Sequence, residues 1–108
     1  MSTFVKIGRV SDIPPLGARC VKTLGTSIGV FRTADDRIYA IENRCPHRGG
    51  PLSEGIVHGT SVTCPLHNTV VSLVTGEVEG PDGGSVMTVA VDVVDGVIFV
   101  DLPNARAA

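Results

Sequence analysis

The sequence is short of aromatic residues, of cysteine and of net charge, and each shortage narrows what the chain can do. Aromatic residues make up 4% of the 108 residues, Trp is absent, and there are three cysteines. An odd number of cysteines gives no complete disulfide framework, so we expect the fold to rest on an ordinary hydrophobic core. The formal net charge of −2 excludes a strongly basic protein of the kind that binds nucleic acids through bulk electrostatics.

Long apolar stretches are missing as well. No segment approaches the ~20 consecutive apolar residues that span a bilayer. The opening "MSTFVKIGRV" also lacks the apolar run that follows the basic start of a secretory signal. We therefore expect one cytoplasmic domain over residues 1–108 that binds neither membranes nor nucleic acids. In that reducing compartment, metal binding is the leading use for a pair of cysteines.

The periodicity of the apolar residues favours strands. Val and Ile supply much of the apolar content, 13 glycines and seven prolines imply many turns, and no segment keeps a helical period beyond a turn or two. Asp95-Gly96 lies between two apolar runs and predicts a hairpin with a two-residue turn. We expect strands over 3–10, 19–24, 27–33, 37–42, 61–64, 70–78 (a pair turning at Thr75-Gly76), 86–94 and 97–102. This pattern predicts an all-β antiparallel sandwich or small barrel.

The basic residues are distributed unevenly along the chain. Every Lys and Arg except Arg106 lies in residues 1–48, whereas acidic residues continue as far as Asp101. Because strands from the two halves of a chain can alternate within a sheet, we expect an ordinary mixed surface on the folded protein.

Two short stretches each place a cysteine and a histidine on either side of a proline. They are "NRCPHRGGPL" (43–52), with Cys45 and His47, and "VTCPLHNTV" (62–70), with Cys64 and His67. Gly and Pro in these stretches disfavour a regular helix or strand. We therefore expect both Cys–His pairs on loops, over about residues 43–55 and 62–70.

Four explanations compete for the repeated Cys–His pair. Two Cys and two His can hold a tetrahedral zinc ion, although zinc motifs usually group Cys with Cys and His with His. A Cys–His nucleophilic pair needs only one of the loops. Chance placement of a buried thiol and a surface imidazole explains one pair more easily than two. In a [2Fe–2S] centre of mixed ligation, one iron takes two thiolates and the other two imidazoles, so each loop supplies one ligand of each kind.

The remaining cysteine and histidine fall outside both loops. Cys20 lies in a predicted strand between Arg19 and Val21, and we expect it to be a structural thiol. His58 lies between the two boxes, and we expect it on the surface or in a turn rather than among the ligands.

The two boxes resemble those of a known family. "CPHRGGPL" and "CPLHN" are similar to the C-x-H and C-x-x-H boxes of Rieske proteins. Over residues 16–59 and 62–84, the chain resembles the small subunit of assimilatory NAD(P)H nitrite reductase. "GPLSEGIVHG" (50–59) and "TGEVEGPDGG" (75–84) distinguish this group from the Rieske ferredoxins that serve aromatic-ring dioxygenases.

The resemblance implies a fold and a ligand set. It implies a Rieske-type antiparallel β fold in which the two loops form a cluster-binding subdomain holding one [2Fe–2S] cluster. By position, Cys45 and Cys64 would ligate the inner iron, and His47 and His67 the outer iron. Pro81 would lie on a third loop that shields the cluster.

The resemblance also implies a partner and a reaction. The partner is a large subunit with FAD, an NAD(P)H site, sirohaem and a [4Fe–4S] cluster, which together reduce nitrite to ammonia during nitrate assimilation. The small chain itself carries no recognisable nucleophile, general base or nucleotide-binding loop, so we expect it to belong to an oxidoreductase without being catalytic alone. Two alternatives remain: a free-standing Rieske ferredoxin that delivers electrons to an aromatic-ring dioxygenase, and a purely structural module.

Overall fold

The structure is a computed structural model that describes residues 4–22, 27–45, 50–65, 69–80 and 83–101. Within these residues the regular elements are strands and two short 3-10 helices. The elements are β1 (Phe4–Arg9), η1 (Val10–Asp12), β2 (Ala18–Lys22), β3 (Ser27–Arg32), β4 (Ile38–Glu42), η2 (Leu52–Glu54), β5 (Ile56–His58), β6 (Ser61–Thr63), β7 (Val70–Ser72), β8 (Val78–Glu79), β9 (Thr88–Val89), β10 (Val91–Val94) and β11 (Val97–Asp101). This all-β content confirms the predicted fold class.

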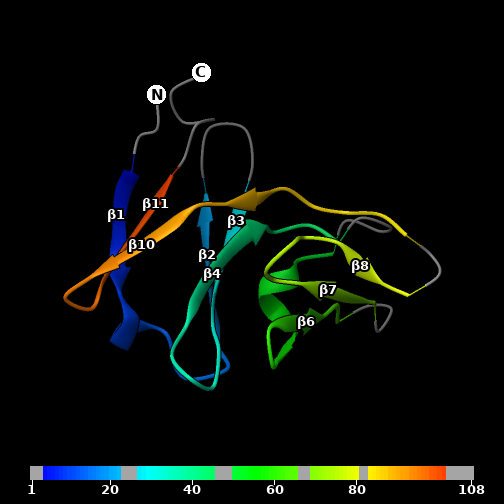
Figure 1. Ribbon diagram of the computed structural model, residues 1–108, viewed down its shortest axis with the longest axis horizontal. Helices are drawn as coiled ribbons and strands as arrows, with labels where there is room; N and C mark the ends of the chain where they lie inside the picture. Colours follow the sequence, from blue (N-terminus) through cyan, green and yellow to red (C-terminus); the bar gives the residue numbers. More distant parts are fainter. Residues whose placement is uncertain (1–3, 23–26, 46–49, 66–68, 81–82, 102–108) are drawn as a thin grey trace.

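The strands form three antiparallel sheets. Their strand orders are β1-β11-β10, β2-β3-β4-β9 and β5-β6-β7-β8, and we call them sheets A, B and C. Figure 1 shows them following one another along the longest axis, with sheet B in the middle. Sheets A and B each join strands from both ends of the chain, whereas sheet C comes from one continuous stretch.

Sheet B is covered on both faces because the side chains of β3 alternate between two hydrophobic clusters. Ile28 and Val30 pack in a cluster with Ile98 and Val100 of sheet A. Phe31 points the other way, into a cluster with residues of sheet C. Alternation along a strand sends neighbouring side chains to opposite faces, which explains why β3 is almost continuously buried.

Several predicted strands are confirmed in position and pairing. β3 and β4 form a hairpin, β7 pairs with β8 across the turn that contains Thr75 and Gly76, and β10 pairs with β11. At the last turn, Asp95 and Gly96 have φ values of 52° and 77°, as a type I′ turn requires.

Two predictions about strands are wrong. The single strand expected over residues 86–94 is two: β9 pairs with β4 of sheet B, and β10 crosses into sheet A. One run of alternating residues cannot show where a chain changes sheets. The prediction also missed β5, whose three residues are too few to show a period.

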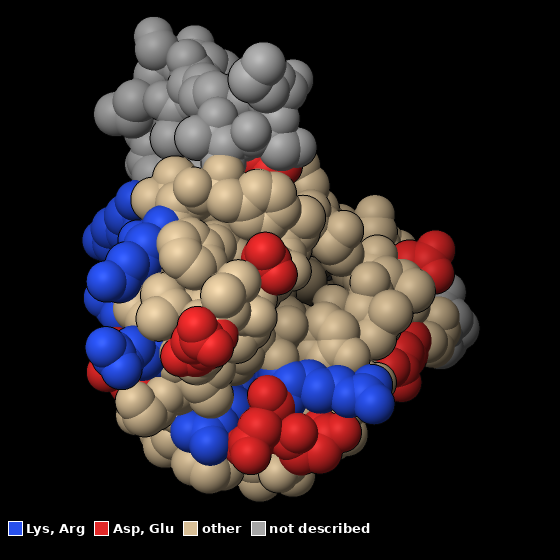
Figure 2. Space-filling view, turned by 60° about the vertical axis from the view of Figure 1, so that its left-hand side comes forward, with Lys and Arg blue, Asp and Glu red and all other residues tan. Residues whose placement is uncertain are grey.

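Lys and Arg are unevenly placed on the fold. Sheet C, built from residues 56–79, contains none, so the described basic residues belong to sheets A and B and their adjoining turns. In Figure 2, Lys and Arg gather along one side and the lower edge, with Asp and Glu beside them and also on areas without basic residues. The expected mixing therefore holds where both halves of the chain share a sheet, and not in sheet C. No helix among the described residues is long and apolar enough to cross a membrane.

Arg32 fastens the segment after β1 to the β3–β4 hairpin. One of its guanidinium nitrogens donates to the carbonyl oxygens of Val10 and Ile13 at 3.2 and 2.6 Å. The other two nitrogens donate to the Asp36 carboxylate at 2.8 and 3.0 Å. Only 17% of the Arg32 side chain is exposed, so these bonds are partly shielded from water.

We predict that Arg32→Lys lowers the free energy of unfolding by about 1–2 kcal/mol, because an ammonium group cannot make the same forked set of bonds. Urea denaturation followed by circular dichroism measures the change. Arg37→Lys is the matched control, since Arg37 pairs with Asp35 at the surface and both side chains are 65% exposed. Equal denaturation midpoints for the two variants would contradict the role given to Arg32.

Candidate metal centre

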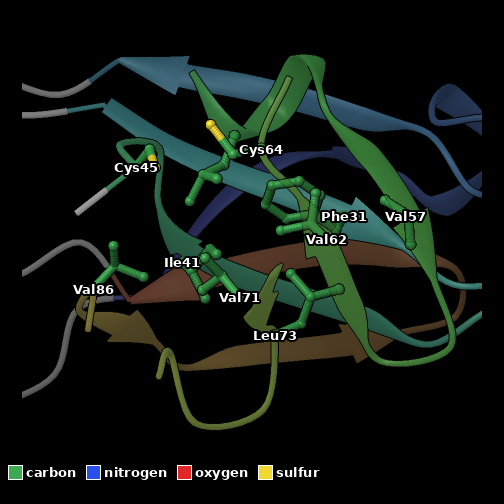
Figure 3. Packing of buried hydrophobic residues seen from close by; sticks show 10 residues of the cluster. Phe31, Ile41, Cys45, Val57, Val62, Cys64, Val71, Leu73 and Val86 are labelled. Carbon is green, nitrogen blue, oxygen red and sulfur yellow. The ribbon is translucent and has the colours of Figure 1, made fainter. Parts of the chain in front are cut away.

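The two cysteines of the boxes lie in the same buried cluster. Cys45 follows β4 and Cys64 follows β6, and both residues are fully buried. Figure 3 shows them at one end of the cluster, together with Val86, while Phe31, Val62 and Val57 lie toward the other end. The structure thus brings together two thiols that are 19 residues apart (64 − 45) in the sequence.

The two loops share one backbone geometry at their cysteines. The N–H of Cys45 donates to the carbonyl oxygen of Gly50 at 2.8 Å, and that of Cys64 donates to the carbonyl oxygen of Thr69 at 2.7 Å. In both cases the acceptor lies five residues after the cysteine. Each cysteine therefore starts a hydrogen-bonded loop of the same length, and each predicted histidine ligand belongs to that loop by sequence.

A third segment covers the cluster from the side of β7 and β8. Val86 is 7% exposed and packs with the two cysteines, and its N–H donates to the carbonyl oxygen of Gly76 at 2.8 Å. The N–H of Val78 donates to Gly84 at 2.9 Å, so residues 84–86 run along the β7–β8 turn. The predicted shielding proline, Pro81, lies outside the described residues.

The structure describes half of the predicted ligand set. His47 and His67 lie outside the described residues, and within those residues no group of three or more His, Cys, Asp or Glu is placed to hold a metal ion. Cys20 is exposed on β2, and His58 is exposed on β5 with Nε2 2.6 Å from Thr63 Oγ1. Both therefore lie apart from the two buried thiols.

The thiol pair fits one of the competing explanations better than another. A nucleophilic cysteine needs access to its substrate, whereas Cys45 and Cys64 are both fully buried among apolar side chains. Sulfur ligands supplied by two loops into a dry environment suit the thiolate half of an iron–sulfur centre. The donors present therefore fit such a cluster.

Sequence reasoning missed the residues that hold the loops in place. The side chain of Asn43 bonds to Ser53 across the first loop, and Gly76 accommodates Val86. Asn43 is an ordinary loop residue in the sequence, since its partner becomes visible only when the loop is folded. A recognisable signal existed for the loop length alone, because the spacing from cysteine to acceptor is equal in the two boxes.

The description of the Rieske [2Fe-2S] domain family matches residues 3–90 of the chain. Among curated proteins, the 3-phenylpropionate/cinnamic acid dioxygenase ferredoxin subunit of Escherichia coli (strain K12) is 35% identical over 99 residues, which cover 90% of this chain and 92% of that protein. The chain spans a far smaller share of two larger relatives: 15% of 4beta-methylsterol monooxygenase from Methylococcus capsulatus and 16% of a chloroacetanilide N-alkylformylase oxygenase component from Rhizorhabdus wittichii.

Solved structures of nitrite reductase small-subunit type are also similar. The E. coli protein NirD has a TM-score of 0.83 and 26% identity, with 95% of this chain and 99% of that chain covered. A candidate NADH-dependent nitrite reductase small subunit from Mycobacterium tuberculosis has a TM-score of 0.85, with 94% and 96% covered. At 23% identity, the latter shows the shared fold alone.

The position of the third segment depends on the missing side chain at Gly76. Its φ is 79°, and a Cβ added there would collide with the carbonyl oxygen of Val86. We predict that Gly76→Ala lowers the free energy of unfolding by about 2–4 kcal/mol, the combined cost of the left-handed backbone and of overpacking.

Gly59→Ala is the matched control for this substitution. Gly59 has a similar φ of 57°, but nothing lies within 4 Å of an added Cβ. The control should therefore show only the backbone cost, about 1 kcal/mol, in the same urea titration. Equal losses in the two variants would mean that contact with the third segment contributes nothing.

Proposed function

The chain belongs to the Rieske [2Fe–2S] domain family, and from this premise we propose that it is the electron-transfer small subunit of an assimilatory NAD(P)H nitrite reductase. Membership indicates one [2Fe–2S] cluster and an electron-transfer role within an oxidoreductase. The proposal adds the partner, a large subunit with FAD, an NAD(P)H site, sirohaem and a [4Fe–4S] cluster. It also adds the reaction, reduction of nitrite to ammonia in the cytoplasm.

We assign the cluster to the four residues of the two boxes. Cys45 and Cys64 would hold the inner iron, and His47 and His67 the outer iron. When bound, the cluster supplies a one-electron carrier. The chain contributes a dry, apolar surround for the two thiolates, in which Leu52 and Val86 pack beside Cys45 and Cys64 and exclude water from the sulfur side.

The observation that carries the nitrite reductase assignment lies outside the boxes. The stretches 50–59 and 75–84 resemble that small subunit, and in the structure they include η2, β5 and β8, adjoining the buried cysteines. The similarity to NirD over 95% of the chain supports the same assignment. The boxes alone indicate only a Rieske centre.

A second candidate function has an observation of its own. The 35% identity to a dioxygenase ferredoxin subunit covers 90% of this chain, and it exceeds the 26% identity to NirD. A free-standing ferredoxin that delivers electrons to an aromatic-ring dioxygenase is therefore the alternative. The two functions differ in their partner: a stable sirohaem-containing complex for the first, and a soluble shuttle for the second.

The ligand assignment predicts the metal content of the purified protein. Anaerobically purified protein should contain iron and acid-labile sulfide in equal amounts. His67→Ala should lose most of both, because the outer iron is left one ligand short, while the far-ultraviolet circular dichroism of the strands persists. His58→Ala, at the exposed histidine on β5, is the control that should keep its iron. Stoichiometric zinc without sulfide in the wild type would refute the assignment.

The partner assignment predicts a growth phenotype. Deletion of the gene should abolish growth on nitrite as the sole nitrogen source, and the tagged chain should copurify with a sirohaem-containing subunit. Normal growth combined with lost oxidation of an aromatic substrate would instead support the dioxygenase ferredoxin. Rescue of growth by His67→Ala as well as by the wild type would show that the chain is needed but its cluster is not.

A further inference from the structure

The two cysteine loops are anchored in different ways. The second loop connects β6 to β7, and the ladder between these strands, with Thr63 opposite Val70, holds its ends together. The first loop connects β4 to η2, and a strand and a 3-10 helix cannot pair as a ladder. The hydrogen bonds that join its two ends must therefore come from elsewhere.

The side chain of Asn43 supplies these bonds. Its Oδ1 accepts from the N–H of Ser53 at 2.7 Å, and its Nδ2 donates to Ser53 Oγ at 2.9 Å. Nδ2 also donates to Cys20 Sγ on β2 at 3.3 Å, and the N–H of Asn43 donates to the carbonyl oxygen of Ser27 at 2.8 Å. One residue thus ties together both ends of the first loop and the edge of sheet B.

The chemistry of the contacts fixes the orientation of the amide. The Ser53 N–H can only donate, so the oxygen of Asn43 must face it and the nitrogen must face Ser53 Oγ and Cys20 Sγ. The missing side chain of Gly29 on β3 leaves room here, since a Cβ at Gly29 would lie 3.4 Å from Asn43 Oδ1. The bonds are partly buried, which makes their loss more costly than at the surface.

We propose that Asn43 is the positioning residue of the first loop: it holds Cys45, two residues further on, in register with Cys64. It does so by joining the loop ends where the second loop uses a β-ladder. The proposal rests on the ligand assignment of Cys45 made above, and not on the identity of the partner protein. Asn43 itself touches neither cysteine of the boxes in this scheme and acts only through the loop.

Two substitutions at this position separate the amide's contributions. Asn43→Ala removes every side-chain bond to Ser53. Asn43→Asp keeps an acceptor for the Ser53 N–H, and its second oxygen can accept from the Ser53 hydroxyl, which rotates to donate. The aspartate variant should therefore hold the loop nearly as well as the wild type.

The test compares cluster-loaded proteins by three measurements: the rate of iron release to a chelator, the electron paramagnetic resonance spectrum of the reduced cluster, and urea unfolding. Asn43→Ala should release iron about five to ten times faster than the wild type and show broadened or shifted g values. Asn43→Asp should restore the release rate to within about twofold of the wild type.

Thr33→Ala is the control for a general loss of stability. Thr33 is 1% exposed and its Oγ1 accepts from the N–H of Arg37 at 3.0 Å, in the β3–β4 turn away from the two loops. This variant should unfold at lower urea than the wild type while keeping its iron release rate and spectrum. The proposal is overturned if Asn43→Ala matches the wild type in both cluster measurements, or if Thr33→Ala changes them as much.

Cys45→Ser distinguishes failure of this inference from failure of the ligand assignment. If Cys45→Ser retains normal iron and sulfide, Cys45 is not a ligand, and both proposals fall. If Cys45→Ser loses the cluster while Asn43→Ala behaves as the wild type, the ligand assignment stands and only the role of Asn43 is refuted.

Discussion

The burial of β3 on both faces is the constraint on which the rest of the structure depends. Ile28 and Val30 hold sheet A, and Phe31, one residue further, packs into the cluster that contains the cysteines. A shift of one residue in the register of β3 would exchange these sets and remove both contacts together. Gly29 is part of the same arrangement, because a Cβ at that position would lie 2.7 Å from the Phe31 ring. The cysteine site is therefore positioned by the same strand that joins the other two sheets.

The site combines two loops that are alike at their cysteines and different at their ends. The equal hydrogen bonds from Cys45 and Cys64 give the loops the same length, while the first loop depends on a side chain and the second on paired strands. Such fixed geometry suits electron transfer, in which ligands held by a rigid frame need little rearrangement when the charge of the centre changes. The third segment, with Val86, adds an apolar cover to this frame.

Local features of the fold could be predicted from the sequence, and long-range ones could not. The β3–β4 hairpin and the Asp95-Gly96 turn follow from alternation and from turn chemistry, which involve neighbouring residues only. The pairing of Cys45 with Cys64 in one cluster followed from the repeated box, a specific pattern of residue types. The crossing from β9 to β10 was missed because it depends on which sheet each strand meets. The contacts of Asn43 were missed for the same reason, since they join three segments far apart in the chain.

The unequal anchoring of the loops has a consequence for how the sequence can drift. A β-ladder is made by backbone groups, so many different residues can occupy positions 63 and 70 without loosening the second loop. The first loop is held by one amide with a fixed donor and acceptor, and few side chains reproduce that pair. Selection on two loops that carry equivalent ligands should therefore act on different kinds of position: on pairing strands in one, and on the identity of a single residue outside the ligand box in the other.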